Sequence, residues 1–73
     1  ISLKNYNELL EKQNGVCAIC GRKNFLKRGL YVDHDHKTNK VRGLLCNHCN
    51  LALGYFDDSI PFLEKAIKYI SNN

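Results

Sequence analysis

Two identical cysteine spacings in a chain of only 73 residues constrain its fold more than any other feature. Cys17 and Cys20 form one Cys-x-x-Cys pair, Cys46 and Cys49 form a second, and 25 residues separate the two pairs. A chain this short buries too little apolar surface to be stable without a cross-link or a bound metal. Paired Cys-x-x-Cys motifs are typical of tetrahedral zinc sites, so the spacing predicts that the four thiolates hold Zn²⁺.

The two cysteine pairs allow three other interpretations. Two disulfides would also cross-link a secreted protein, and Cys-x-x-Cys thiols also occur in redox proteins. His48 lies inside the second motif and is a possible zinc ligand, although four thiols already complete a tetrahedral site. The spacing favours zinc, and zinc thiolates are typical of a reducing cytoplasm. We also expect a soluble protein with no membrane partner, because the sequence contains no long apolar run and no signal-peptide pattern.

Basic residues are concentrated in the middle of the chain. The net charge is +4, and residues 22–42 alone contain seven Lys or Arg against two Asp, which leaves a local charge of +5. A basic flank around an acidic centre suits a polyanion that is held at its phosphates while a metal ion occupies the centre. The simpler interpretation is a solvated charged surface.

Apolar residues at spacings of three and four predict helices in the first and second halves of the chain. The first helix covers residues 3–13 and ends at the stop signal Asn14-Gly15. The second covers residues 47–55. We expect the apolar face of the first helix to pack on the cysteine-bearing half; that face carries Leu3, Tyr6, Leu9 and Leu10.

A third helix is predicted near the end of the chain. Asp57, Asp58 and Ser59 are candidate N-caps, and Pro61 suits the first helical turn. Its apolar face carries Phe62, Leu63, Ala66, Ile67 and Ile70.

Two short strands precede the second helix. Residues 30–33 and 41–45 are rich in β-branched, aromatic and leucine side chains, and the polar turn 37–40 separates them, which predicts a β-hairpin. The hairpin and the helix at 47–55 make a β-β-α unit. The basic segment 22–28, between Gly21 and Gly29, is expected to be a loop.

This unit brings together residues suited to phosphodiester hydrolysis. Folding the hairpin onto the helix can bring Asp33 close to Asn50, and their oxygens suit Mg²⁺ or Mn²⁺. His34 is neutral near pH 7 and can take a proton from a water that attacks phosphorus. His36 is a second candidate for the site. Asp35 either orients an imidazole or faces solvent. The expected phosphate contacts are Lys37, Lys40 and Arg42.

Three stretches of the sequence together resemble a known family. They read Cys17-Ala18-Ile19-Cys20, Asp33-His34-Asp35-His36 and Lys40-Val41-Arg42-Gly43-Leu44-Leu45-Cys46-Asn47-His48-Cys49-Asn50. This combination resembles the recombination endonuclease VII family of phage Holliday-junction resolvases, which are His-Me finger (ββα-metal, HNH-like) nucleases. The resemblance covers residues 14–54, over half of the chain.

The resemblance implies roles for specific residues. Asp33 and Asn50 would bind the catalytic divalent metal, His34 would be the general base, and His36 would assist at the scissile phosphate. Zinc on the four cysteines would be structural, and cleavage would leave 5′-phosphate and 3′-hydroxyl ends. The resemblance does not include the long helical C-terminal region through which those resolvases dimerise and recognise branched DNA. It therefore implies nuclease chemistry and leaves the form of the DNA substrate open.

We therefore expect residues 1–73 to form one small α+β domain, a zinc-stabilised ββα-metal (His-Me finger) unit with flanking N- and C-terminal helices. We expect it to be a Mg²⁺- or Mn²⁺-dependent DNA endonuclease that nicks one strand per site on double-stranded or branched DNA, in the host cell cytoplasm if it is phage-encoded. The alternative from another class is a non-catalytic zinc-finger module that binds nucleic acid. Monomer and homodimer both remain open.

Overall fold

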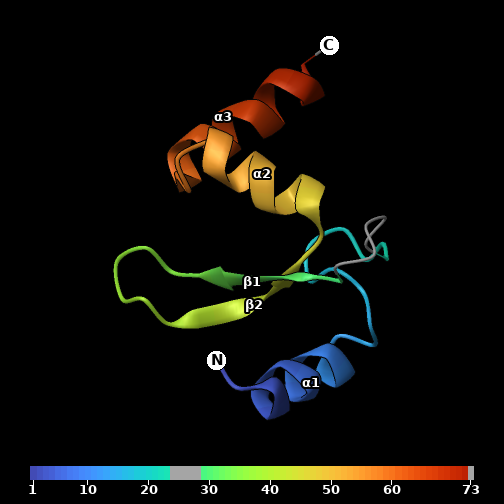
Figure 1. Cartoon of the computed structure of the whole chain (residues 1–73). Coiled ribbons are helices and arrows are strands. Elements are labelled where there is room, and N and C mark those ends of the chain that lie inside the picture. The colour runs from blue at the N-terminus through green and yellow to red at the C-terminus, as the bar shows by residue number, and fades with distance from the viewer. Residues whose placement is uncertain (24–28, 73) are drawn as a thin grey trace.

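The described part of the chain, residues 1–23 and 29–72 of a computed structural model, forms a small α+β fold (Figure 1). The order of the elements is α1 (Leu3–Lys12), β1 (Tyr31–His34), β2 (Val41–Leu45), α2 (Asn47–Tyr55) and α3 (Ile60–Ser71). The predicted hairpin and helices are confirmed, with ends that differ by at most one residue where both ends were predicted. Residues 24–28 of the expected basic loop lie outside the described residues.

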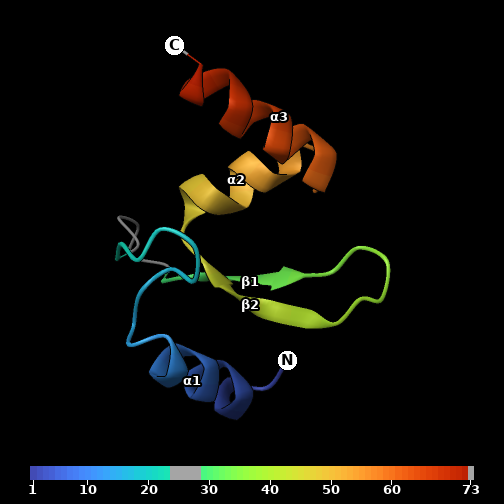
Figure 2. The same ribbon diagram turned by 180° about the vertical axis from the view of Figure 1, so that it is seen from behind.

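The two strands form an antiparallel hairpin at the centre of the molecule. Tyr31 lies opposite Leu45, and Asp33 lies opposite Gly43. In both views α1 lies below the hairpin, and α2 and α3 lie above it (Figures 1 and 2). The hairpin is thus covered from both sides by helices that come from opposite ends of the chain.

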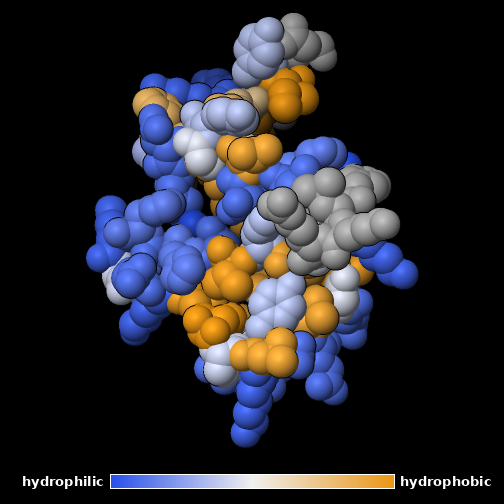
Figure 3. Space-filling view, in the orientation of Figure 1, coloured by the Kyte–Doolittle hydropathy of each residue, from blue (hydrophilic) through white to orange (hydrophobic). Residues whose placement is uncertain are grey.

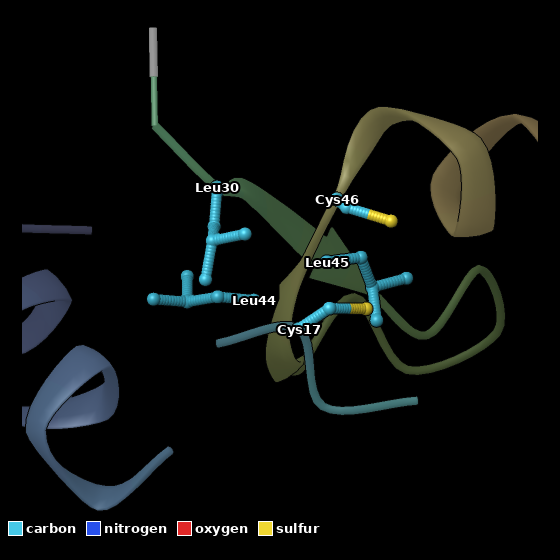
Figure 4. Close-up of a cluster of buried hydrophobic side chains, with 5 residues drawn as sticks. All are labelled: Cys17, Leu30, Leu44, Leu45 and Cys46. Atoms are coloured by element: carbon cyan, nitrogen blue, oxygen red, sulfur yellow. The ribbon is translucent and has the colours of Figure 1, made fainter. Parts of the chain in front are cut away.

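Within the described part of the chain, the buried core is very small. Its members are Cys17, Leu30, Leu44, Leu45 and Cys46 (Figure 4). Leu30 and Leu44 point toward α1, while both sulfurs point the other way. Partly buried side chains of α1 pack against this cluster; they are Tyr6, Leu9 and Leu10. The predicted packing of the first helix is confirmed for these three residues and wrong for Leu3, which lies at the start of α1 and is 75% exposed. Since two of the five core residues are cysteines, the core and the predicted metal site are one structure.

A glutamine side chain fixes α1 to the outer edge of β2. The Gln13 Oε1 atom accepts from the Leu44 N–H at 2.9 Å, and Nε2 donates to the Leu44 and Val16 carbonyls, each at 2.9 Å. The amide therefore takes the place of a neighbouring strand along one residue of β2. A Cβ atom on Gly43 would lie only 3.2 Å from Gln13 Oε1, so this contact also favours glycine at position 43.

The third helix contributes little to this core. Ser59 caps it by accepting from the Phe62 N–H at 3.2 Å. Leu63 and Ala66 are half-buried, whereas Ile67 and Ile70 are 65% and 72% exposed. In Figure 3 the main hydrophobic area lies over the hairpin and α1, separate hydrophobic patches lie on α3, and hydrophilic side chains cover the loop end of the hairpin. Within the described ranges, no helix is long and apolar enough to cross a membrane.

The other two N-cap candidates close α2 instead. The Asp57 N–H donates to the Gly54 carbonyl at 3.0 Å, and the Asp58 N–H donates to the Leu53 carbonyl at 2.8 Å. This pair of bonds is the Schellman motif that ends many helices. Asp57 and Asp58 have φ angles of 53° and 55°, in the left-handed region that few residues other than glycine adopt.

We predict that Gln13→Ala destabilises the zinc-loaded protein by about 1–3 kcal/mol, because it leaves the buried Leu44 N–H without its acceptor. Urea unfolding followed by circular dichroism measures the change. Asn7→Ala, on the exposed face of the same helix, is the matched control and should change stability by less than about 0.5 kcal/mol. Equal effects of the two substitutions would contradict the role assigned to Gln13.

Candidate functional site

The four cysteines are placed to bind a metal ion. Their Sγ atoms all lie within 4.8 Å of one another, and the Sγ atoms of Cys20 and Cys46 are 3.7 Å apart. A tetrahedral zinc ion with Zn–S bonds of about 2.3 Å separates its sulfurs by about 3.8 Å. The donor set therefore fits zinc both in chemistry and in spacing. It joins the segment after α1 to the junction of β2 and α2.

Local backbone geometry turns each cysteine pair inward. The Ile19 N–H points at Cys17 Sγ at 3.4 Å, and the Cys49 N–H points at Cys46 Sγ at 3.5 Å. Cys46 is also the N-cap of α2, so the positive end of the helix faces the sulfurs and favours thiolates. The Ala18 N–H donates to the Leu44 carbonyl at 3.1 Å, which ties the first pair to β2.

The thiols differ in how readily they ionise. Arg22 Nε donates to Cys20 Sγ at 3.3 Å, and this bond lowers the pKa of Cys20 to about 6. Burial raises the pKa of Cys49 to about 12. Cys20 is thus ready to act as a ligand at neutral pH, whereas Cys49 ionises when a cation compensates for its charge.

The second part of the site is centred on Arg42 in β2. Arg42 Nε and an Nη atom bind the Asp33 carboxylate at 2.6 and 3.1 Å, and its two Nη atoms bind the Asp58 carboxylate at 3.0 and 2.9 Å. One guanidinium is therefore shared by two carboxylates. Arg42 lowers the pKa of Asp58, with a smaller contribution from the charge of His36. The carboxylates in turn raise the pKa of Arg42.

A β-bulge makes this arrangement possible. His34 lies opposite Val41 although Asp33 lies opposite Gly43, so Arg42 is an extra residue in β2. In a regular ladder Arg42 would lie opposite His34 and point to the face of Leu44, away from Asp33. The bulge breaks this alternation, and Arg42 reaches the Asp33 carboxylate.

The two candidate histidines stand at the end of the hairpin. His34 is the last residue of β1, His36 follows in the turn, and both are exposed. Between them, the Asp35 carboxylate accepts from the Lys37 and Thr38 N–H groups at 2.8 and 3.1 Å, which lowers the pKa of Asp35. Neither role expected for Asp35 matches this contact, because the carboxylate binds backbone N–H groups of the turn that carries His36.

Asn50 lies on the first turn of α2 and is half-buried. It lines a small hollow with Tyr31, and Tyr31 and Asp33 share one face of β1 because side chains two apart in a strand point the same way. Within residues 1–23 and 29–72, no hydrogen bond joins the Asn50 and Asp33 side chains. The structure thus brings Asn50 to the face of β1 that carries Asp33, without a direct contact between the two.

The expected phosphate contacts lie on or next to the hairpin turn. Lys37 and Lys40 are exposed there. Arg42 is engaged with the two carboxylates. The sequence analysis missed the role of Asp58, which it assigned only as a candidate helix cap. No local pattern indicates this role, because Asp58 reaches Arg42 across 16 positions through the length and direction of α2.

We predict that removal of zinc with a strong chelator abolishes cooperative unfolding and exposes all four thiols, because the sulfurs are part of the core. Circular dichroism and thiol titration measure both effects, and added Zn²⁺ should restore the fold. An unchanged unfolding midpoint after chelation would contradict a structural metal.

The stability of the metal-loaded protein should depend on pH with a defined sign. Metal binding keeps the pKa values of the cysteine thiols below those of the unfolded chain, so the stabilisation by the metal is lost as pH falls.

Comparison with known proteins places this geometry in context. The family model for recombination endonuclease VII matches residues 1–72. The Gene 59 protein of Mycobacterium phage L5 is 52% identical over 68 residues, which are 92% of this chain and 42% of the relative. The Gene 59 protein of Mycobacterium phage D29 is 48% identical over 71 residues, or 96% of this chain and 43% of the relative. This chain thus spans less than half the length of those relatives. It belongs to the recombination endonuclease VII family.

Proposed function

We propose that this chain is a metal-dependent DNA endonuclease of the His-Me finger type, with a structural zinc ion on its four cysteines. The observation that carries the proposal is the family match over residues 1–72, which includes the hairpin, α2 and both cysteine pairs. The arrangement of side chains in the site also supports the proposal. An exposed imidazole, a carboxylate and a guanidinium stand together on a hairpin that the metal-binding cysteines anchor.

Asp33 and Asn50 would hold the catalytic Mg²⁺ or Mn²⁺. A carboxylate and a carboxamide are oxygen donors of the kind these ions prefer, which leave room for water and phosphate oxygens as further ligands. The Asp33 side chain is 12% exposed, so it is reachable from solvent. When bound, the ion would stabilise the negative charge that develops on the phosphate and on the leaving oxygen.

The remaining steps fall to the protein's own side chains. A ring nitrogen of His34 takes a proton from the attacking water, whose oxygen forms a new bond to phosphorus. The bond from phosphorus to the 3′ oxygen breaks and this oxygen takes a proton from solvent water, which yields 5′-phosphate and 3′-hydroxyl ends. His36 assists at the scissile phosphate. Contacts to phosphate oxygens from Lys37, Lys40 and Arg42 hold the DNA backbone.

One base and one metal per site imply that each encounter cuts one strand. The substrate is double-stranded or branched DNA, and cleavage of both strands needs a homodimer or two successive encounters of a monomer. We place the activity in the cytoplasm of the host cell, given the phage relatives. A zinc module that only binds nucleic acid is the competing function. Such a module has no need of His34 beside Asp33.

We predict that His34→Ala reduces Mg²⁺-dependent nicking of supercoiled plasmid by about 100-fold or more, because the attacking water loses its base. Zinc content and DNA binding should stay unchanged. His48→Ala, which removes an exposed imidazole of α2, is the matched control, and this variant should nick plasmid normally. Binding without cutting by the unaltered protein, in Mg²⁺ and in Mn²⁺ and on branched DNA too, would favour the non-catalytic module.

We predict that Lys37→Ala and Lys40→Ala each lower the slope of log affinity against log salt concentration by about one, since each removes one phosphate contact. Fluorescence anisotropy with a labelled duplex at several salt concentrations measures the slope. Lys68→Ala, near the C-terminal end of α3, removes the same charge and should leave the slope unchanged. If all three variants behave alike, the hairpin turn is not the phosphate-binding surface.

A further inference from the structure

We propose that Asp58 is a positioning residue of this site, which holds Arg42 so that the guanidinium can release Asp33 when a divalent ion binds there. The inference rests on the proposed function, because it takes Asp33 as a ligand of the catalytic metal. It gives a role to a residue of the α2–α3 turn, outside both the hairpin and the cysteine pairs.

Arg42 and a divalent ion would compete for the Asp33 carboxylate. Both carboxylate oxygens of Asp33 accept hydrogen bonds from Arg42, at 2.6 and 3.1 Å. A divalent ion needs at least one of these oxygens, so Arg42 must give up part of this pair before the ion can bind. An arginine with no other acidic partner would resist that exchange.

Asp58 supplies the other partner. It accepts from both Nη atoms of Arg42, at 3.0 and 2.9 Å, in a bidentate pair like the one to Asp33. Arg42 therefore keeps two charge-assisted hydrogen bonds when it releases Asp33. The formal charges point the same way. One guanidinium between two carboxylates leaves a net charge of −1, which favours an added cation, whereas Asp33 and Arg42 alone would be neutral.

The backbone of Asp58 is fixed where α2 ends. Its N–H donates to the Leu53 carbonyl at 2.8 Å in the Schellman motif, which accounts for the left-handed φ angles of Asp57 and Asp58, 53° and 55°. In Figure 1 this turn lies on the same side of the molecule as the hairpin loop. Asp58, Arg42, Asp35 and Lys37 line one hollow of about 300 Å³, next to the expected phosphate contacts.

Mn²⁺ binding to the zinc-loaded protein, measured by calorimetry without DNA, tests the proposal. We expect Asp58→Asn to weaken Mn²⁺ binding by about 10-fold, as substitution of residues that orient metal ligands does. Asparagine tolerates left-handed φ angles, so the turn should persist. Asp57→Asn is the matched control for loss of a negative charge. It should change the affinity by less than about 2-fold, in the range expected where direct coupling is absent.

A double-variant cycle separates positioning from simple loss of charge. In the Arg42→Gln background no guanidinium competes for Asp33, so only the charge of Asp58 still acts on the ion, and Asp58→Asn should change Mn²⁺ affinity by less than about 2-fold, as Asp57→Asn does. An equal loss in both backgrounds would overturn the proposal and leave Asp58 as a general source of negative charge. So would an Asp58→Asn variant that binds Mn²⁺ as tightly as the unaltered protein.

Plasmid nicking by the same proteins distinguishes failure of the positioning role of Asp58 from failure of the proposed function. If the unaltered protein binds Mn²⁺ and nicks DNA while Asp58→Asn has no effect on Mn²⁺ affinity, the positioning role is wrong and the proposed function stands. If the unaltered protein neither binds Mn²⁺ nor nicks DNA, the proposed function is wrong and the positioning role is overturned with it. Zinc content and circular dichroism confirm that each variant is folded.

Discussion

The cluster of four cysteine sulfurs is the constraint on which the rest of this structure depends. Two of these residues, Cys17 and Cys46, also belong to the buried core, which has five members among the residues that the structure describes. A core of this size cannot offset the entropy lost when about 70 residues become ordered. A metal ion on the sulfurs would connect the segment after α1, the end of β2 and the start of α2. It would thereby fix the elements that carry the candidate catalytic residues.

Cys46 has a further consequence for the site. It follows the last residue of β2 directly and is also the N-cap of α2, so the sheet and the helix meet at one of the four residues placed to bind a metal. The orientation of α2 relative to the hairpin is fixed at this junction and by Cys49 and Leu53, which pack against the core. Asn50, one turn into α2, reaches the Asp33 face of β1 for this reason. At the far end of α2, the same orientation carries Asp58 to Arg42.

Local patterns and long-range contacts differ in how far the sequence predicts them. Apolar spacing and strand alternation predicted α1 and the hairpin, because these elements follow from periodicity. Spacing alone also predicted the cysteine cluster. The bonds of Gln13 to Leu44, across 31 positions, and of Asp58 to Arg42 leave no periodic signal, because each depends on where two elements meet. The catalytic roles of His34, His36, Asp33 and Asn50 remain predictions from the motif.

The charge distribution allows one small surface to attract both a cation and a polyanion. The chain carries +4 overall, yet the group of Asp33, Asp58 and Arg42 carries −1. Charges on an exposed surface act over about 8 Å at physiological salt, so a DNA phosphate approaching from solvent first meets the lysines of the hairpin turn. In the proposed site, a small divalent ion would reach the carboxylates. Once such an ion neutralised Asp33, the same group would become positive and would attract the phosphate as well. Metal and DNA would then bind in a mutually favourable way, each strengthening the other through charge alone.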